Sequence, residues 1–256
     1  MKKILLILVC LCLLASPVFA LSAAIQAVVG ATSACTTPSG TIVGGDAEGF
    51  ENGSACYDRY ANGTTSPAAT GTLSTYDSAA KHGGTYSMSM DMGANVAAYT
   101  EWDLGSEDTD CSFRFWFYAP AYTAFKSSRI FATYDLAAWD PATNYPVVSV
   151  RYGKDGTGPY FVLSNAAGAT STKIYVTEAA WYKIQVDYND AGTHELSVWN
   201  AAAEEDAESP QTVADSGTHD PRYIYLGQYG TSADYDPPKL YFDDFKFQAA
   251  GGDIAD

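Results

Sequence analysis

Positive charge is scarce in this sequence. The chain has 14 Lys and Arg residues against 30 Asp and Glu residues and 3 His, a net charge of −16. Without the first twenty residues, which include Lys2 and Lys3, 12 basic residues face 30 acidic ones, a net charge of −18. A domain this acidic repels phosphate backbones and anionic membrane surfaces, so nucleic acid is excluded as an expected partner. Neutral glycans and cations remain compatible partners.

Cysteine is also scarce. Of the five cysteines, Cys10 and Cys12 lie in the apolar N-terminal stretch, which leaves Cys35, Cys56 and Cys111. An exported protein can form disulfides, and an odd number of cysteines allows one internal bridge. We expect Cys56 to pair with Cys111. No Cys-x-x-Cys or Cys/His spacing indicates zinc.

Long hydrophobic runs are missing beyond the N-terminus. Met1 to Lys3 form a positive start, Ile4 to Leu14 are apolar, and compact residues end at Ala20. This is the pattern of a signal peptide over residues 1–20. The apolar run is too short to span a bilayer comfortably, although its continuation to Val29 leaves an uncleaved anchor open. We therefore expect a secreted or cell-surface protein, extracellular or periplasmic, with no stable membrane span after signal cleavage.

Composition divides the remaining chain. Residues 21–45 are small and rich in Gly, Ser and Thr, which predicts a flexible linker or arm. Residues 46–248 hold most of the aromatic side chains and are expected to form one domain, and residues 249–256 form a short tail. Aromatic residues make up 14% of the chain, and these fit a pleated, half-buried surface.

Short alternating runs between turn residues predict an all-β domain. A dozen or so strands at such spacing indicate a two-sheet sandwich or a barrel. One segment, Ala201 to Ala207, has the composition of a helix or of an acidic loop. The expected strands are Thr85 to Met90, Val96 to Leu104, Cys111 to Tyr118, Arg129 to Tyr134, Pro146 to Tyr152, Pro159 to Ser164, Thr172 to Val176, Trp181 to Tyr188, Thr193 to Trp199, Arg222 to Tyr229 and Lys239 to Phe247.

The strand register of one hairpin can be predicted from its side-chain pattern. Side chains alternate between faces with a period of two, so the register must place the apolar sets together. Pairing Val186 with Leu196 achieves this, and it sets Lys183 opposite Trp199. Trp181 is then a diagonal neighbour within aromatic reach. The predicted result is a polar face that carries two tryptophans and a lysine.

The same alternation sets Phe113, Phe115 and Phe117 on the opposite face from Arg114, Trp116 and Tyr118. An exposed indole offers a flat platform for the apolar face of a pyranose ring. The candidate carbohydrate-binding residues are therefore Trp116, Trp181, Trp199, Tyr118, Lys183 and Arg114. The alternative is that a loop or a third layer covers the tryptophans and makes them part of a core.

Four segments carry a resemblance to a known family. Phe50 to Gly53 resembles an opening Phe-Glu-x-Gly strand, and Leu240 to Phe247 resembles a closing apolar-aromatic-Asp-Asp strand. His82 to Met88 and Glu178 to Ile184 resemble two segments between them. Together they resemble the concanavalin A-like lectin/glucanase superfamily and related carbohydrate-binding jelly rolls. The resemblance implies a two-sheet antiparallel jelly-roll β-sandwich.

The resemblance also implies a cofactor. In such jelly rolls the first and last strands often share a structural calcium, and Glu51, Asp243 and Asp244 would be its ligands here. Calcium prefers several oxygen ligands, and adjacent carboxylates repel each other unless a cation neutralises them. The alternative is that Asp243 caps or hydrogen-bonds a neighbouring loop and that Asp244 is solvated.

Catalytic motifs are missing. Glu101-Trp102-Asp103 begins like a glucanase strand, but the residues that follow break the spacing. The three histidines are scattered and match no nucleophile motif. The primary hypothesis is a secreted, non-catalytic, lectin-like protein with a glycan or polysaccharide as partner. The alternatives are a polysaccharide hydrolase or lyase on the same fold, and a structural or adhesion protein of the cell surface or an extracellular appendage that self-associates.

Overall fold

The computed structural model describes residues 47–48, 58–61, 80–84, 87–90, 98–121, 127–135, 146–190, 192–202, 204–215, 219–229, 239–249, 251–252 and 254. The chain divides at residue 36, and all of these residues belong to the second unit. They contain no helix long and apolar enough to cross a membrane. The expected signal peptide and linker, and with them Glu51, Cys35 and Cys56, lie outside the described residues.

The described part of the chain contains fourteen strands. They are β1 (Ala47–Glu48), β2 (Asp58–Ala61), β3 (Met88–Met90), β4 (Ala98–Asp103), β5 (Asp110–Ala119), β6 (Ser127–Tyr134), β7 (Val148–Lys154), β8 (Pro159–Asn165), β9 (Ile174–Tyr175), β10 (Ala180–Asn189), β11 (Thr193–Asn200), β12 (Gln211–Ala214), β13 (Tyr223–Tyr229) and β14 (Leu240–Ala249). Each strand predicted from the sequence corresponds to one of them, with ends that differ by a few residues.

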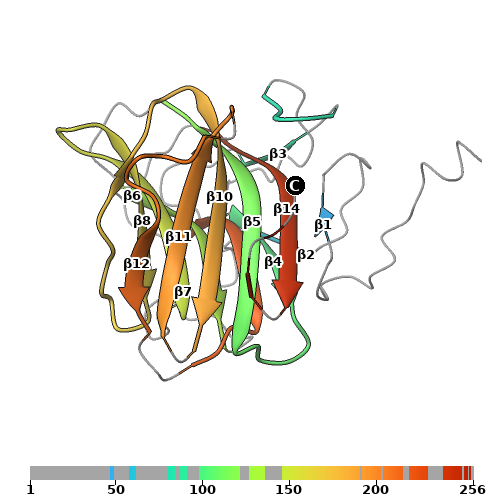
Figure 1. Cartoon of the computed structure of the whole chain (residues 1–256). Helices are drawn as coiled ribbons and strands as arrows, with labels where there is room; N and C mark the ends of the chain where they lie inside the picture. Colours follow the sequence, from blue (N-terminus) through green and yellow to red (C-terminus); the bar gives the residue numbers. More distant parts are fainter. Residues whose placement is uncertain are drawn as a thin grey trace, which may run out of the picture. The chain divides into compact units, whose positions relative to one another are not determined.

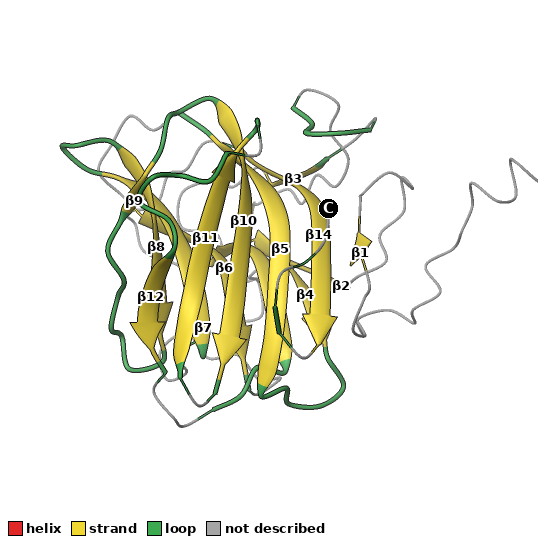
Figure 2. Cartoon of the chain, in the orientation of Figure 1, coloured by secondary structure: helices red, strands yellow, loops and turns green. Residues whose placement is uncertain are grey.

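The strands build two antiparallel sheets (Figure 1). The first, called here the β5 sheet, has the order β1-β14-β5-β10-β11-β12, and β3 also pairs with β14. The second, the β6 sheet, has the order β2-β4-β13-β6-β7-β8-β9. In the β5 sheet, β14 and β5 lie side by side although more than a hundred residues separate them (Figure 2). The all-β two-sheet prediction is thus confirmed.

The predicted hairpin register is also confirmed. In the β10–β11 pair, Val186 lies opposite Leu196, and Lys183 lies opposite Trp199. A second hairpin joins β7 and β8, which pair up to Lys154 and Pro159. The segment after β11 shows no helix in its described residues. It forms a turn whose Glu205 makes an isolated bridge back to Trp199, so the loop alternative is the correct one.

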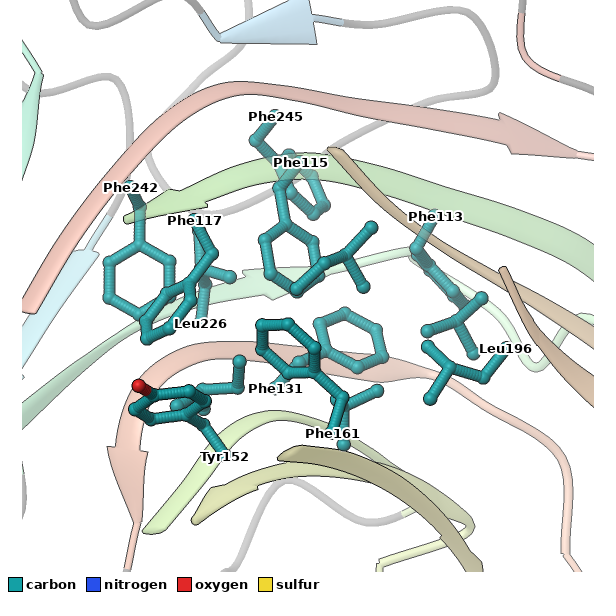
Figure 3. Packing of buried hydrophobic residues seen from close by; sticks show 14 of the residues in the cluster. Phe113, Phe115, Phe117, Phe131, Tyr152, Phe161, Leu196, Leu226, Phe242 and Phe245 are labelled. Carbon is teal, nitrogen blue, oxygen red and sulfur yellow. The ribbon is translucent and has the colours of Figure 1, made fainter. Parts of the chain in front are cut away.

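Aromatic side chains from both sheets fill the core (Figure 3). The fully buried Phe113, Phe115 and Phe117 of β5 face inward. The Phe113 ring lies 5.2 Å from that of Phe131 in the opposite sheet, and the Phe117 ring lies 5.8 Å from that of Phe161. Each such pair contributes about 0.5–1.5 kcal/mol beyond the burial of its area. These contacts fix which face of β5 points outward.

The expected pairing of Cys56 with Cys111 is not present, because Cys111 carries a free thiol. Cys111 belongs to β5 and lies opposite Tyr188 and Ala249 of the neighbouring strands. Its side chain is fully buried in the hydrophobic core, and this burial raises the pKa of the thiol well above its usual value. Inward orientation therefore makes Cys111 a packing residue.

Candidate functional site

The outer face of the β5 sheet brings together all six predicted carbohydrate-binding residues. Strand β5 supplies Arg114, Trp116 and Tyr118, because they alternate with the three core phenylalanines. Their direct neighbours on β10 are Gln185, Lys183 and Trp181, in that order. On β14 the corresponding neighbours are Lys246, Asp243 and Tyr241. On the other side of β10, Trp199 of β11 lies opposite Lys183.

Aromatic and cationic side chains are in contact along this face. The Tyr118 ring lies 5.6 Å from that of Trp181 and 6.0 Å from that of Tyr241, both edge to face. The Lys183 Nζ lies 4.8 Å from the centre of the Trp199 ring, a cation–π distance. Trp181 and Trp199 are both partly exposed. The outer face therefore offers apolar rings next to fixed positive charge.

Trp116 differs from the other two tryptophans because a histidine covers it. The His82 ring stacks on the Trp116 ring with centres 3.4 Å apart and planes 14° apart, and it meets Trp181 edge-on at 6.0 Å. Only 8% of the Trp116 surface is exposed to solvent. One face of this indole is thus occupied by His82, in agreement with the alternative that a loop covers part of the aromatic set.

Asp243 holds the His82 segment in place. Its Oδ2 accepts hydrogen bonds from the backbone amides of His82 at 3.0 Å and Gly83 at 3.3 Å, and its Oδ1 accepts one from the amide of Asp244 at 3.0 Å. Asp243 is 1% exposed, and burial together with the Asp244 charge raises its pKa to about 7. The three amide donors oppose that rise. Asp243 thereby fixes His82 over Trp116.

A β-bulge explains why two consecutive aspartates occur here. Asp243 lies opposite Trp116 and Lys246 lies opposite Arg114. Two residues of β14 therefore lie between these pairs, where β5 has one. Asp244 takes the left-handed conformation with a φ of 46°, which Asp tolerates better than most residues. Its Oδ2 lies 3.6 Å from the His82 Nδ1. The bulge turns Asp244 and Lys246 toward the same region of the outer face.

A pocket opens where these elements meet. Its volume is about 360 Å³, in the lower range for small-molecule sites. The lining residues are His82, Arg114, Trp116, Lys183, Ala201, Asp244 and Lys246. Burial lowers the pKa of His82, and the Asp244 charge partly offsets this effect. The His82 imidazole is therefore neutral at pH 7 and able to accept a proton.

The described residues alone do not form a calcium site. Within them, no group of three or more His, Cys, Asp or Glu residues could hold a metal ion. The Asp243 oxygens are engaged by amide donors, and Asp244 is directed to His82, whereas calcium requires six to eight oxygen ligands. Calcium at Glu51, Asp243 and Asp244 stays a prediction, with Glu51 outside the described part of the chain.

Besides Ala201, two residues of the pocket, His82 and Lys246, were not anticipated from the sequence. The alternation of β14 alone does not place Lys246 beside Arg114, because the bulge shifts the side-chain phase by one residue. His82 belongs to a loop that precedes β5, and it lies more than thirty residues before Trp116 in the sequence. The Asp243-Asp244 pair was the one available signal of an irregular strand, since aspartate is depleted in regular strands.

Comparisons with known proteins identify the fold. No protein-family profile and no curated protein sequence matches the chain. The chain is similar to the solved structure of a cellulose-induced protein, Cip1, with a TM-score of 0.59 and 14% identity over 82% of this chain and 100% of the other. It is also similar to the globular domain of T. cruzi calreticulin, with a TM-score of 0.51 and 9% identity over 82% of this chain and 88% of the other.

The class of protein follows from the sheets and these similarities. The chain folds as an antiparallel jelly-roll β-sandwich. At such low identity the similarity establishes the fold and leaves the function to the site itself.

Proposed function

We propose that this protein is a secreted, non-catalytic carbohydrate-binding protein related to the concanavalin A-like superfamily. The observation that carries this proposal is the outer face of the β5 sheet, where Trp181 contacts His82 and Trp199 contacts Lys183. His82 and Lys183 line the pocket together with Arg114. Apolar rings beside a few polar groups are what a sugar ring requires of a binding site. One similar protein is named for its induction by cellulose, which agrees with a polysaccharide partner.

Substitution of the exposed tryptophans tests the proposal. The mature protein is screened against a glycan array and insoluble polysaccharides, and the best ligand is titrated. We expect Trp181→Ala and Trp199→Ala each to weaken binding about tenfold, which corresponds to the loss of one aromatic contact of about 1.4 kcal/mol. Tyr160→Ala is the matched control, because Tyr160 packs on Tyr175 in the β6 sheet, away from the pocket.

Two results of this experiment would contradict the proposal, one at the level of the site and one at the level of the function. Unchanged binding by the two tryptophan variants would reject this face as the binding site. No binding of the wild type to any glycan would reject the function and favour a structural or adhesion role. A parallel screen with a calcium chelator tests the predicted calcium, since loss of binding or of thermal stability in the chelator would support it.

A second function is favoured by one specific contact. His82 is a neutral imidazole in the pocket, with Asp244 3.6 Å from its Nδ1, and this arrangement suits a general base. A polysaccharide hydrolase or lyase therefore remains the alternative to binding alone. Incubation with polysaccharides and measurement of released ends distinguishes the two, and product release that His82→Ala abolishes would establish the enzyme.

A further inference from the structure

After β14 ends at Ala249, the chain returns over the outer face of the β5 sheet. Gly251 and Gly252 take left-handed conformations, with φ of 63° and 95°, which glycine adopts without a steric cost. The chain turns back there toward the body of the sheet (Figure 2). Ile254 then contacts side chains of β5 and β10. Gly251, Gly252 and Ile254 are called here the return segment.

Three outward-facing side chains hold the backbone of the return segment. The Gln248 Nε2 donates a hydrogen bond to the Gly251 carbonyl at 2.8 Å. The Gln185 Oε1 accepts one from the Ile254 amide at 3.3 Å, and the Arg114 Nη1 donates one to the Ile254 carbonyl at 2.6 Å. These side chains belong to β14, β10 and β5, which are neighbours in the sheet. The return segment is therefore tied to three strands at once.

Exposure differs between the two ends of this face. Arg114 and Gln185 are each 3% exposed although they point outward, in agreement with a return segment that lies over them. Tyr118 and Trp181 belong to the same two strands and are partly exposed. The outer face is therefore covered at its Arg114 end and open at its aromatic end.

The pocket lies between these two ends. Lys183 lines it and sits between Gln185 and Trp181 on the outer side of β10. A saccharide chain that enters past Trp181 and Tyr118 can reach Lys183, but beyond it the chain meets Ile254, which is bound to Arg114. The return segment thus lies where the next sugar unit would continue along the strands.

We infer that the return segment closes one end of the saccharide site, so that the pocket takes the terminal unit of a saccharide chain. This inference rests on the proposed carbohydrate-binding function and specifies which part of the polymer is bound. A site of this kind counts chain ends, whereas a groove that is open at both ends counts the length of the polymer.

Binding capacity at two chain lengths tests the inference. The probe is whichever of three soluble polysaccharides, mixed-linkage β-glucan, glucomannan and pullulan, the full-length mature protein binds best. It is used intact and after partial hydrolysis, at equal mass, and calorimetric titration gives the number of protein molecules bound at saturation. We expect this number to rise on hydrolysis by the same factor as the number of chain ends.

A variant of the return segment locates the effect. Valine at position 251 would be strained at a φ of 63°, and its Cβ would lie 2.3 Å from the Asp110 Oδ1, so Gly251→Val should displace the segment. Its capacity should then be the same before and after hydrolysis. Gly168→Val is the matched control, because it places the same strain, at a φ of 80°, in a turn of the β6 sheet. The control should keep the wild-type dependence on chain ends.

A second variant covers the case in which Gly251→Val does not fold. Ile254→Pro lacks the amide that donates to Gln185, and it should act in the same direction. A wild-type capacity that does not change on hydrolysis would overturn the inference and leave the proposed function standing. Retention of the wild-type dependence by both variants would overturn the role of the return segment. Binding of none of the three polysaccharides would overturn the inference together with the proposed function.

Discussion

His194 illustrates how a single polar residue can depend on the fold. It is fully buried in β11, and its ring stacks on that of Tyr188 at 4.7 Å. Its Nδ1 accepts a hydrogen bond from the amide of Asn189 at 3.5 Å, and its Nε2 lies 3.2 Å from the Asp215 Oδ1. Burial lowers the pKa of His194, and the Asp215 charge opposes this effect. The folded protein therefore holds a neutral imidazole.

This lowered pKa predicts a loss of stability in mild acid. Below about pH 6.5 the unfolded chain binds a proton at this residue before the folded protein does. The free energy of unfolding should therefore fall as the pH decreases from 7.5 to 5.5, by no more than about 1.4 kcal/mol per pH unit for this one group. Urea unfolding at several pH values measures it.

The control for this prediction is a variant that lacks the buried histidine. His194→Gln should flatten the dependence, because the group whose pKa is lowered by burial is then absent. Equal slopes for the wild type and for His194→Gln would show that other groups cause the dependence.

Individual residues of the site were predictable wherever strand alternation decides the face. Arg114, Trp116 and Tyr118 could be separated from the core phenylalanines because a side-chain period of two admits one solution when one face is apolar. The position of His82 over Trp116 could not be predicted in this way, because it depends on the amide hydrogen bonds that Asp243 accepts from a distant turn.

Strand packing at the element scale depends on a close approach at Gly153. This residue of β7 lies opposite Ser127 of β6 and Tyr160 of β8. An added Cβ would lie 2.8 Å from the Ser127 Cβ and 3.0 Å from the Tyr160 ring. Glycine is therefore required to let three strands pass at this point.

Gly153→Ala should destabilise the protein by about 1–3 kcal/mol, the usual cost of overpacking. Gly156→Ala is the matched control, because a Cβ at Gly156 in the adjoining turn would meet nothing within 4 Å. That control should be close to neutral. Urea unfolding of both variants measures the difference, and equal stabilities would show that the strands adjust at no cost.

At the scale of the whole molecule, the excess of negative charge affects thermal stability. Like charges on a compact protein repel each other, and salt screens this repulsion. The melting temperature should therefore rise by a few degrees when sodium chloride is increased from low to moderate concentration. Sodium chloride is preferred to sulfate, which stabilises proteins by exclusion from their surface. A melting temperature that falls or stays constant would contradict the prediction.

Local alternation and turn residues were enough to predict the all-β class, most strand positions and the β10–β11 register. Three features depended instead on long-range packing: Cys111 is a buried free thiol, β14 is bulged, and His82 and Lys246 join Arg114 at one pocket. The residues involved are far apart along the chain. Strands β5 and β14 become neighbours only when the sandwich closes, and no local pattern records which side chains then meet.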